Sequence, residues 1–566
     1  MSKTLIIAEK PSVAVDLAKV LGSFSRQDGY LENRQYIVSW AFGHLLELAE
    51  PEDYDLAFKR WDIGLLPILP ADFKMQEISS GRKQLGALKK LLRSGDVGGV
   101  VNACDAGREG ELIFRRIYQA AKSDKPVKRL WLSEATPAAV REAFRRLRES
   151  RELDSLAAAA EARSEADWLV GINSTRAYTC RHSRLLSLGR VQTPTLALVV
   201  NREKEIRAFK PAPYWELWAT FKKESGETYR GKRFKDKVDR LNSRDEAQSI
   251  LSRLGNQGEV VRVEQRETKE QPPTLFNLND LQKEANKKYG LTAQQTLDAA
   301  QALYEKHKLL TYPRTDSRHL TEAIVSDTLA GRLSALAGSE YATLVPKSMP
   351  VLGKRYADGS KVSDHHAIIP TAARPDLSAM GENEKLVYDL VVRRFLAMFY
   401  PDARYAVTKA ATDVNGEMFL SAGKVELDPG WKKVYKPEEE KKDDDAQTLP
   451  PLKQGEQVAV EKAEAVEKST KAPSRYTEAT LLAAMENAGR FAEDEDLADT
   501  LRETGGIGTP ATRAAIIETL IKRTYIKREK KTLVPTPDGE TLIDLAPELL
   551  KSVDMTAKWE SGLLDI

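Results

Sequence analysis

The stretch GGVVNACDAGREGELIFRRIY, residues 98–118, decides the fold of the first part of the chain. It opens with a β-branched apolar run typical of a buried strand and ends in the pattern of a helix. A second strand-to-helix junction is TLIIAEKPS, residues 4–12, where Pro11 suits a first helical turn. Further apolar runs at 35–42 and 129–133 alternate with helical patterns. This alternation predicts an α/β domain with a mainly parallel sheet.

Acidic residues follow both of these strands. Glu9 comes directly after the first strand, and Asp105 and Glu109 follow the second. Functional groups gather at the carboxyl ends of parallel strands, so we expect the three acids in one crevice. Clustered carboxylates need a cation, and hard oxygen ligands favour Mg²⁺ over zinc. The simpler interpretation is that acids at helix N-termini only interact favourably with the helix dipole and bind no metal.

A tyrosine stands just beyond a second strong signature, LTAQQTLDAAQALYEKHKLLTYPRTDSRHL at 291–320. Thr292 and Gln295 predict a capping box, and we expect the helix that follows to end near Lys308. Tyr312 precedes a proline, which disfavours helical geometry at the tyrosine. Its phenol is therefore expected to be presented, although an isolated Tyr-Pro is more often a packed aromatic before a turn.

The chemistry of a phenol limits what Tyr312 can do unaided. With a reference pKa of about 10 it is a poor nucleophile at neutral pH, so attack requires nearby positive charge or a base. Arg314 and Lys10 are the candidates. Attack on a phosphodiester would keep the bond energy in a phosphotyrosine, so religation would need no external energy source. In agreement, the sequence contains no GxxxxGK[ST] phosphate loop of the kind that binds ATP.

The overall composition sets further limits. A chain of 566 residues is too long for one core, and its 41% hydrophobic content is ordinary for a globular protein. Two cysteines, Cys104 and Cys180, exclude a disulfide framework and a four-cysteine zinc ribbon. A net charge of +3 does not by itself predict a polyanionic partner. Without a long apolar run or a signal-peptide pattern, we expect a cytoplasmic protein.

The rest of the chain changes pattern several times. We expect helices from Thr136 to about Val200, strands within 214–263, and helices again from Leu275. The charged segment 435–447 predicts an exposed or disordered linker. Near the end, the sequence predicts a helix at 510–523 and a β-wing at 525–536, as in a winged helix.

The two acidic junctions together resemble the Toprim fold of topoisomerases and primases. Members usually show Glu in the first element and DxDxE in the second. Here Gly107 stands where the second aspartate is usual. The resemblance therefore implies a metal site with fewer ligands, formed by Glu9 and Asp105 with Glu109 through water.

The YPRTDS segment at 312–317, after the helix containing Gln301, is similar to the active-site region of type IA DNA topoisomerases, particularly the topoisomerase III branch. Six more segments resemble this family in the expected order: ARSEADWLVGINSTRA (162–177), SLGRVQTPTLALV (187–199), QPPTLFNLNDLQ (271–282), DHHAIIPT (364–371), SRYTEATLL (474–482) and GIGTPATRAAII (506–517). The resemblance thus spans almost the whole chain.

The resemblance implies a multidomain α/β and α+β torus whose gate lifts to admit DNA. Its expected parts are a Toprim domain (1–150), a helical DNA-groove domain (151–213 and 465–566), a β-rich hinge (214–274 and 395–464) and a helical domain with Tyr312 (275–394). The implied reaction is ATP-independent cleavage and religation of one strand, which relaxes negative supercoils or decatenates DNA.

The resemblance also implies roles for individual residues. Tyr312 would form a 5′-phosphotyrosyl link with single-stranded DNA, and Arg314 and His365 would stabilise the phosphate. Glu9 would transfer a proton to the leaving 3′ oxygen with help from Lys10. Asp105 would hold Mg²⁺, which is needed mainly for religation.

A small polar loop is the expected grip on DNA. Its residues are Ser187, Leu188, Gly189, Arg190, Val191 and Gln192, whose backbone amides, hydroxyl and guanidinium can hold phosphates. Arg163 and Arg176 are further candidates, and Trp61 and Trp168 either stack on bases or pack in a core. Basic residues of the wing either follow a DNA backbone or form an ordinary solvated face.

Two other functions compete with a topoisomerase. A Toprim primase or nuclease would leave Tyr312 without a role, and a non-enzymatic single-stranded-DNA binder would leave Glu9 and Asp105 unexplained. We expect a monomer that works in the nucleoid without membrane contact, with a helicase as a possible partner. The last residues, MTAKWESGLLDI, end inside a predicted helix.

Overall fold

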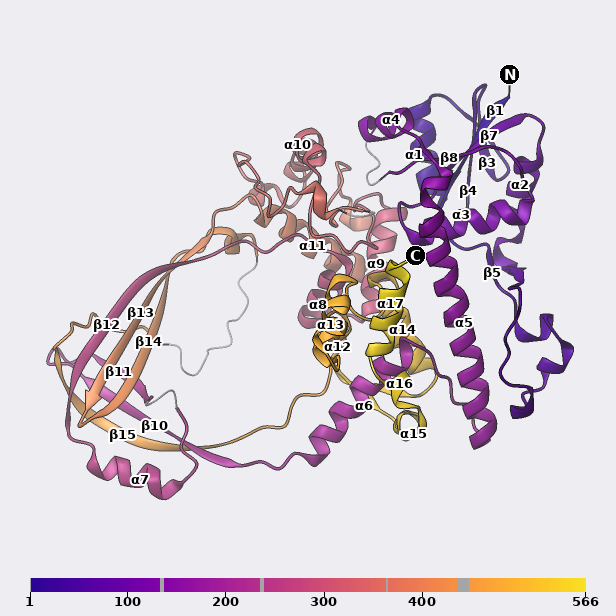
Figure 1. The fold of residues 1–566 in the computed structure, drawn as a ribbon. Coiled ribbons are helices and arrows are strands. Elements are labelled where there is room, and N and C mark those ends of the chain that lie inside the picture. Colours follow the sequence, from indigo (N-terminus) through magenta and orange to yellow (C-terminus); the bar gives the residue numbers. More distant parts are fainter. Residues whose placement is uncertain (1, 133–136, 235–238, 363–364, 436–446) are drawn as a thin grey trace.

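The computed structural model describes residues 2–132, 137–234, 239–362, 365–435 and 447–566. An α/β unit lies at the N-terminal end, helices form the centre, and an elongated barrel lies at the far side (Figure 1). Separate segments join the barrel to the helices at its two sides, so the ribbon closes into a ring, as the resemblance implied. Within the described ranges, no helix has the length and apolar character that a membrane span requires.

The N-terminal sheet has seven strands in the order β2-β3-β4-β1-β7-β8-β9. The strands are β1 (Lys3–Ala8), β2 (Ser25–Gln27), β3 (Tyr30–Glu32), β4 (Tyr36–Trp40), β7 (Val97–Ala103), β8 (Val127–Arg129) and β9 (Arg148–Glu149). The central pairs β4-β1, β1-β7 and β7-β8 are parallel, which confirms the mainly parallel prediction, and the edges are antiparallel.

Helices cover this sheet on its two faces. They are α1 (Pro11–Leu21), α2 (Arg82–Arg93), α3 (Arg108–Ala121) and α4 (Pro137–Arg145). Separate apolar clusters lie on the two faces, one around Leu5 and Ile7 and the other around Ile6 and Ala8. The strand expected at 129–133 was misplaced: β8 ends at Arg129, because only Val127–Arg129 pairs with β7. Residues 133–136, including Thr136, where the helices were expected to begin, lie outside the described residues.

A helical core joins distant parts of the chain. It contains α5 (Asp154–His182), α6 (Gln192–Ala208), α12 (Glu478–Glu486), α13 (Glu495–Glu503), α14 (Pro510–Lys522), α15 (Pro537–Leu545), α16 (Glu548–Lys551) and α17 (Asp554–Leu564). One apolar cluster includes residues of α6, α12, α14 and α15. The predicted helix at 510–523 and wing are confirmed as α14 followed by β16 (Ile526–Glu529) and β17 (Thr532–Pro535).

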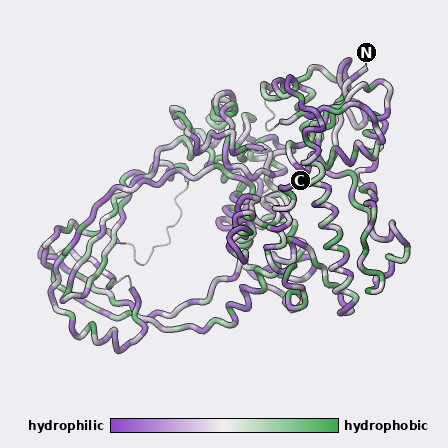
Figure 2. Tube along the Cα trace, viewed as in Figure 1, coloured by the Kyte–Doolittle hydropathy of each residue, from purple (hydrophilic) through white to green (hydrophobic). Residues whose placement is uncertain are grey.

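A six-stranded closed barrel forms the far side of the ring, in the order β10-β11-β14-β13-β12-β15. Its strands are β10 (Pro213–Lys222), β11 (Thr228–Arg233), β12 (Gln257–Glu270), β13 (Ala403–Val414), β14 (Glu417–Asp428) and β15 (Gln457–Ser469), with α7 (Arg244–Arg253) against β10 and β15. Hydrophobic and hydrophilic residues alternate along these strands (Figure 2). Sequence patterns predicted strands within 214–263, and the resemblance implied a β-rich part at 395–464, but closure depends on pairing between β12 and the much later β13 and β15.

The region that carries Tyr312 has its own large apolar core. Its helices are α8 (Leu278–Tyr289), α9 (Ala293–Glu305), α10 (Glu322–Ala337) and α11 (Glu382–Ala397). The capping box is confirmed, since the Thr292 Oγ1 accepts from the Gln295 amide at 3.0 Å and the Gln295 Oε1 accepts from the Thr292 amide at 2.9 Å. The helix ends at Glu305, earlier than Lys308. Residues 436–446 of the expected linker are outside the described residues.

Candidate active site and DNA groove

The first part of the site forms where β1 and β7 end. These strands are parallel neighbours, with Ala8 opposite Ala103, so Glu9 and Asp105 follow at the same edge. The Asp105 amide donates to the Glu9 Oε2 at 3.3 Å. Lys10, at the N-terminus of α1, places its Nζ 3.2 Å from Glu9 Oε1 and 2.9 Å from Asp105 Oδ2. The ammonium therefore lies against both carboxylates.

Tyr312 meets this cluster from the other side of the ring. The Lys10 Nζ donates to the Tyr312 Oη at 2.8 Å. The His365 ring lies 4.3 Å from the Tyr312 ring, centroid to centroid, and its Nε2 is 3.4 Å from Asp105 Oδ2. Tyr304 of α9 makes an edge contact with Tyr312 at 5.5 Å. The phenol is thus presented to charged groups, as the Tyr-Pro sequence predicted.

Burial and charge set the proton affinities of the cluster. Desolvation and the nearby Asp105 carboxylate raise the pKa of Glu9. Although burial opposes the ionised form of Asp105, the His365 hydrogen bond and the Lys10 charge lower the pKa of Asp105. Burial also opposes the Lys10 ammonium, but Asp105 and Tyr312 raise the pKa of Lys10 above its usual value. Desolvation raises the pKa of Tyr312, so the phenol is neutral near pH 7.

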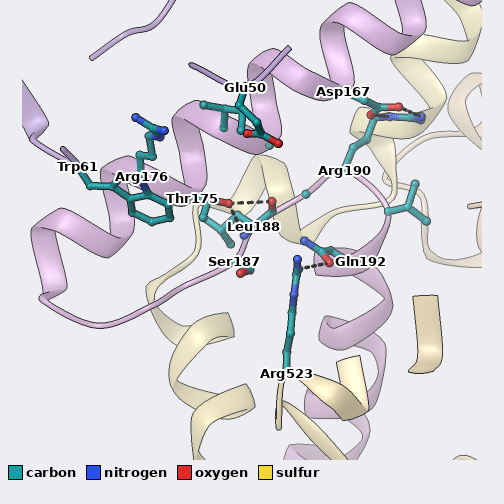
Figure 3. Close-up of a pocket in the computed structure, with 14 residues that line it drawn as sticks. Glu50, Trp61, Asp167, Thr175, Arg176, Ser187, Leu188, Arg190, Gln192 and Arg523 are labelled. Carbon is teal, nitrogen blue, oxygen red and sulfur yellow. Dashed lines mark hydrogen bonds and ion pairs between the residues drawn. The ribbon is translucent and has the colours of Figure 1, made fainter. Parts of the chain in front are cut away.

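A cavity of about 490 Å³ forms the second part of the site. It lies between α5, the start of α6 and the loop before η3 (Ile63–Leu65), and its labelled walls include Trp61, Ser187, Gln192 and Arg523 (Figure 3). A second cavity of about 480 Å³ shares Trp61 and continues along the end of α5 to Cys180 and Leu185. The two cavities share Trp61, and we call them together the groove.

Comparison with known proteins is decisive at this point. Residues 151–566 match the family described as DNA topoisomerase, and residues 4–135 match the Toprim domain. The chain belongs to the DNA topoisomerase family. It is 44% identical to DNA topoisomerase 3 of Bacillus cereus over 575 residues, and this match covers 100% of this chain and 78% of that protein. The Bacillus subtilis DNA topoisomerase 3 is likewise 44% identical over 572 residues, with the same coverage.

A solved structure gives the same answer for the architecture. Full-length topoisomerase I from Thermotoga maritima matches with a TM-score of 0.70 and 25% identity, over 99% of this chain and 86% of that one. The multidomain fold predicted from sequence is therefore confirmed. The enzyme is a DNA topoisomerase whose Toprim domain is a metal-binding unit and whose substrate is DNA.

The predicted metal ligands of this topoisomerase are not all brought together. Glu9 and Asp105 are adjacent, but the Glu109 carboxylate pairs with the ring of His44, a hydrogen bond that lowers the pKa of Glu109. In the ranges that the structure describes, no three His, Cys, Asp or Glu side chains are grouped to hold a metal ion. The two remaining carboxylates still fit a hard cation, since Lys10 already brings positive charge to their oxygens.

Arg314 does not join the catalytic cluster of the topoisomerase. Its side chain is exposed, and the described residues give it no hydrogen bond to Tyr312 or Asp105. The cation that meets the phenol is Lys10.

The 187–192 loop lines the cavity, but its expected phosphate donors are already engaged. Arg190 is only 3% exposed and donates to both carboxylate oxygens of Asp167, at 2.9 and 3.2 Å (Figure 3). The amides of Ser187, Leu188 and Gly189 donate to the hydroxyls of Tyr525, Thr175 and Thr193. In this structure the fold itself uses Arg190 and these amides, and their contact with phosphate stays a prediction.

Three other predicted DNA residues differ in their placement. Trp168 packs against Tyr54 and Phe73 at 5.8 and 5.6 Å and does not line the cavity, so the core-packing alternative holds. Arg163 lies 3.4 Å from Glu560 of α17 and is also absent from the wall. Arg176 lines the cavity but is 5% exposed, and it supports Trp61 at 5.2 Å from the ring.

Arg523 is a groove residue that sequence reasoning did not single out. It was one of several basic residues near the wing, with nothing to separate it from Lys522. In the topoisomerase, Arg523 lines the cavity and donates to Gln192 Oε1 at 2.6 Å. Its position directly after α14, opposite the start of α6, could only come from the packing of these two helices.

Proposed function

We propose that this enzyme is a type IA, topoisomerase III-like DNA topoisomerase that cleaves one strand through Tyr312. The observation that carries the proposal is the 2.8 Å contact between the Tyr312 Oη and the Lys10 Nζ, with Glu9 and Asp105 around the same ammonium. This arrangement places a nucleophile, a cation and a carboxyl of raised pKa together. A primase or a passive DNA binder would have no use for it.

In the proposed cleavage step, the Tyr312 oxygen attacks the phosphorus as the phenol proton leaves to solvent, and the bond to the 3′ oxygen breaks. Lys10 stabilises the negative charge that develops on the phenol oxygen and the phosphate. Glu9 donates its proton to the leaving 3′ oxygen, a role that suits a buried carboxyl with raised pKa. Religation reverses these transfers, with Glu9 as the base, and His365 would steady the phosphate beside Tyr312.

We propose that Mg²⁺ is the metal and that Glu9 and Asp105 hold it, with Glu109 contributing through water. When bound, the ion supplies positive charge that orients DNA for religation. Gly107 has extended backbone, with φ of −173° and ψ of 178°, which an aspartate also adopts. Gly107→Asp should therefore lower the Mg²⁺ concentration for half-maximal relaxation, whereas an unchanged midpoint would separate residue 107 from the metal site.

We propose that single-stranded DNA lies in the groove. Trp61 is 43% exposed and free to stack on a base, and Arg523 offers an exposed cation for phosphate. The N-terminus of α6 adds its dipole, since Val191 at the N-cap provides no side-chain cap. Arg190 would contribute only after DNA displaces Asp167.

Gate opening would separate the Tyr312 region, residues 275–394, from the Toprim domain. Besides the catalytic contacts, an ion-pair network closes the gate: Arg318 and Lys283 contact Glu486 of α12 at 3.0 and 2.8 Å. We further propose a monomer in the nucleoid that works with a helicase. Decatenation measured beside relaxation of negatively supercoiled plasmid would identify the main task.

The central test is to trap the covalent intermediate. The enzyme is incubated with single-stranded oligonucleotide labelled on either side of the cleavage site and stopped with detergent, and we expect protein linked to the 5′ phosphate. Tyr312→Phe should form no adduct, while Tyr304→Phe, which keeps the neighbouring ring, should form it. An equal yield from Tyr312→Phe would end the proposal.

A further inference from the structure

A fully buried ion pair lies directly behind the acidic edge of the Toprim sheet. Arg129, the last residue of β8, has a side chain that is 1% exposed, and Glu111 of α3 is 0% exposed. The Arg129 Nε is 3.1 Å from Glu111 Oε2. Burying two full charges costs several kcal/mol per ion before their attraction is counted. Such a buried pair is therefore a candidate for a functional role.

The Arg129 guanidinium also reaches the chain that carries Asp105. It donates from one terminal nitrogen to the carbonyls of Cys104 and Leu130, both at 2.8 Å, and of Asn102 at 3.1 Å. The other terminal nitrogen donates to the Asp105 carbonyl at 2.7 Å. One side chain therefore holds the end of β7 and the following turn in place.

Glu111 completes the support from the helix side. Its Oε2 accepts from the Asn102 amide side chain at 2.9 Å, and its Oε1 accepts from Arg115 at 2.9 Å. Asn102 in turn accepts from the Cys104 amide at 3.1 Å. The turn packs so closely on α3 that a Cβ at Gly110 would lie 2.1 Å from the Asp105 carbonyl. The main chain on both sides of Asp105 is thus fixed from behind.

We propose that Arg129 and Glu111 are positioning residues that aim the Asp105 carboxylate at Lys10, His365 and the metal. The proposal rests on the proposed function in so far as Asp105 is a metal ligand. The Asp105 Oδ2 must meet Lys10 at 2.9 Å and His365 at 3.4 Å at the same time. Groups behind the ligands of a metal commonly change its affinity by about 10–100-fold.

The experiment compares Arg129→Lys with Arg148→Lys. Arg148 lies over the same Trp131 ring as Arg129, at 5.4 and 5.1 Å, and within the described part of the chain its side chain bonds to Glu152 and has no hydrogen bond to the turn. Binding of Mn²⁺ to the intact protein without DNA is measured by electron paramagnetic resonance. We expect Arg129→Lys to weaken Mn²⁺ binding by about tenfold or more and Arg148→Lys to leave it unchanged. Metal-free adduct formation by Arg129→Lys should fall much less than its Mn²⁺ affinity.

A purely structural role would lower thermal stability and the active fraction without moving the Mn²⁺ dissociation constant. That result, or equal Mn²⁺ affinity in folded Arg129→Lys, would overturn the inference. If Arg129→Lys does not fold, Glu111→Gln is used, because it removes the negative charge of the pair but keeps the shape of the side chain. Wild-type protein that binds Mn²⁺ but forms no adduct would instead refute the proposed function, and the two failures are therefore distinguishable.

Discussion

The catalytic cluster and the DNA groove use their charged groups in opposite ways. In the cluster, Lys10 contacts the Tyr312 phenol and both carboxylates, so the expected residues meet across two regions of the chain. In the groove, the buried Arg190 pairs with Asp167, and the exposed groups are Trp61 and Arg523. A motif thus shows which segment forms a site, but pairing decides which of its side chains is available.

The largest expected effect tests Glu9 as the proton donor of the cluster. Glu9→Gln cannot donate a proton and should slow adduct formation by about 10²–10⁴-fold. Since the pKa of Glu9 is raised, its acid form persists to higher pH than for an ordinary glutamate, and cleavage should fall as the pH rises through that value. Religation, which needs the carboxylate, should rise over the same interval. Rapid-quench rates from pH 4 to 9 check both limbs.

If the cleavage rate of Glu9→Gln still falls with pH as the wild-type rate does, the group whose protonation controls cleavage is not Glu9.

The next effect tests whether positive charge at the phenol matters. Lys10→Met keeps the length of the side chain but removes the ammonium, and cleavage should fall by about 10²–10³-fold. The rate of adduct formation is measured at saturating oligonucleotide. Lys19→Met on the same helix is the control, because Lys19 is 70% exposed and pairs only with Asp16 in the described residues. Equal losses in the two variants would contradict the role of Lys10.

A smaller effect is expected in the groove. Trp61→Ala removes the exposed ring and should raise KM for single-stranded oligonucleotide about tenfold with little change in kcat, because stacking on one base contributes about 1–3 kcal/mol. Trp168→Phe keeps the packing with Tyr54 and Phe73 and should leave KM within about twofold. A larger increase for Trp168→Phe would mean that the packed tryptophan touches DNA.

The smallest expected effect concerns a single phosphate contact. Arg523→Met should weaken DNA binding a few-fold and reduce the slope of log Kd against log salt by about one unit. Fluorescence anisotropy over a range of salt concentrations measures that slope. The neighbouring Lys522→Met, which removes an exposed charge outside the cavity wall, should change the slope less. Identical slopes for the two variants would remove Arg523 from the groove contacts.

Local sequence patterns predicted the elements that depend on near neighbours. The strand-to-helix junctions at Glu9 and Asp105, the capping box at Thr292 and the helix with its wing near the C-terminus all follow from spacing of a few residues. The predicted contact between the two acids also holds, because parallel neighbouring strands end at the same edge. Positions that depend on distant partners were predicted less well: Glu109 turns to His44, and Trp168 packs against Tyr54 and Phe73.

The sequence by itself determined the chemistry that this protein carries: a phenol before a proline, acids after two strands, and a polar loop before a helix. Only the tertiary structure decided that Lys10 is the cation at Tyr312, that the barrel closes, and that Arg523 is exposed whereas Arg190 is buried. The physical reason is how far apart in the chain the interacting groups lie. Dihedral preferences and caps act within a few residues, whereas ion pairing and burial depend on side chains that lie hundreds of residues apart in the chain.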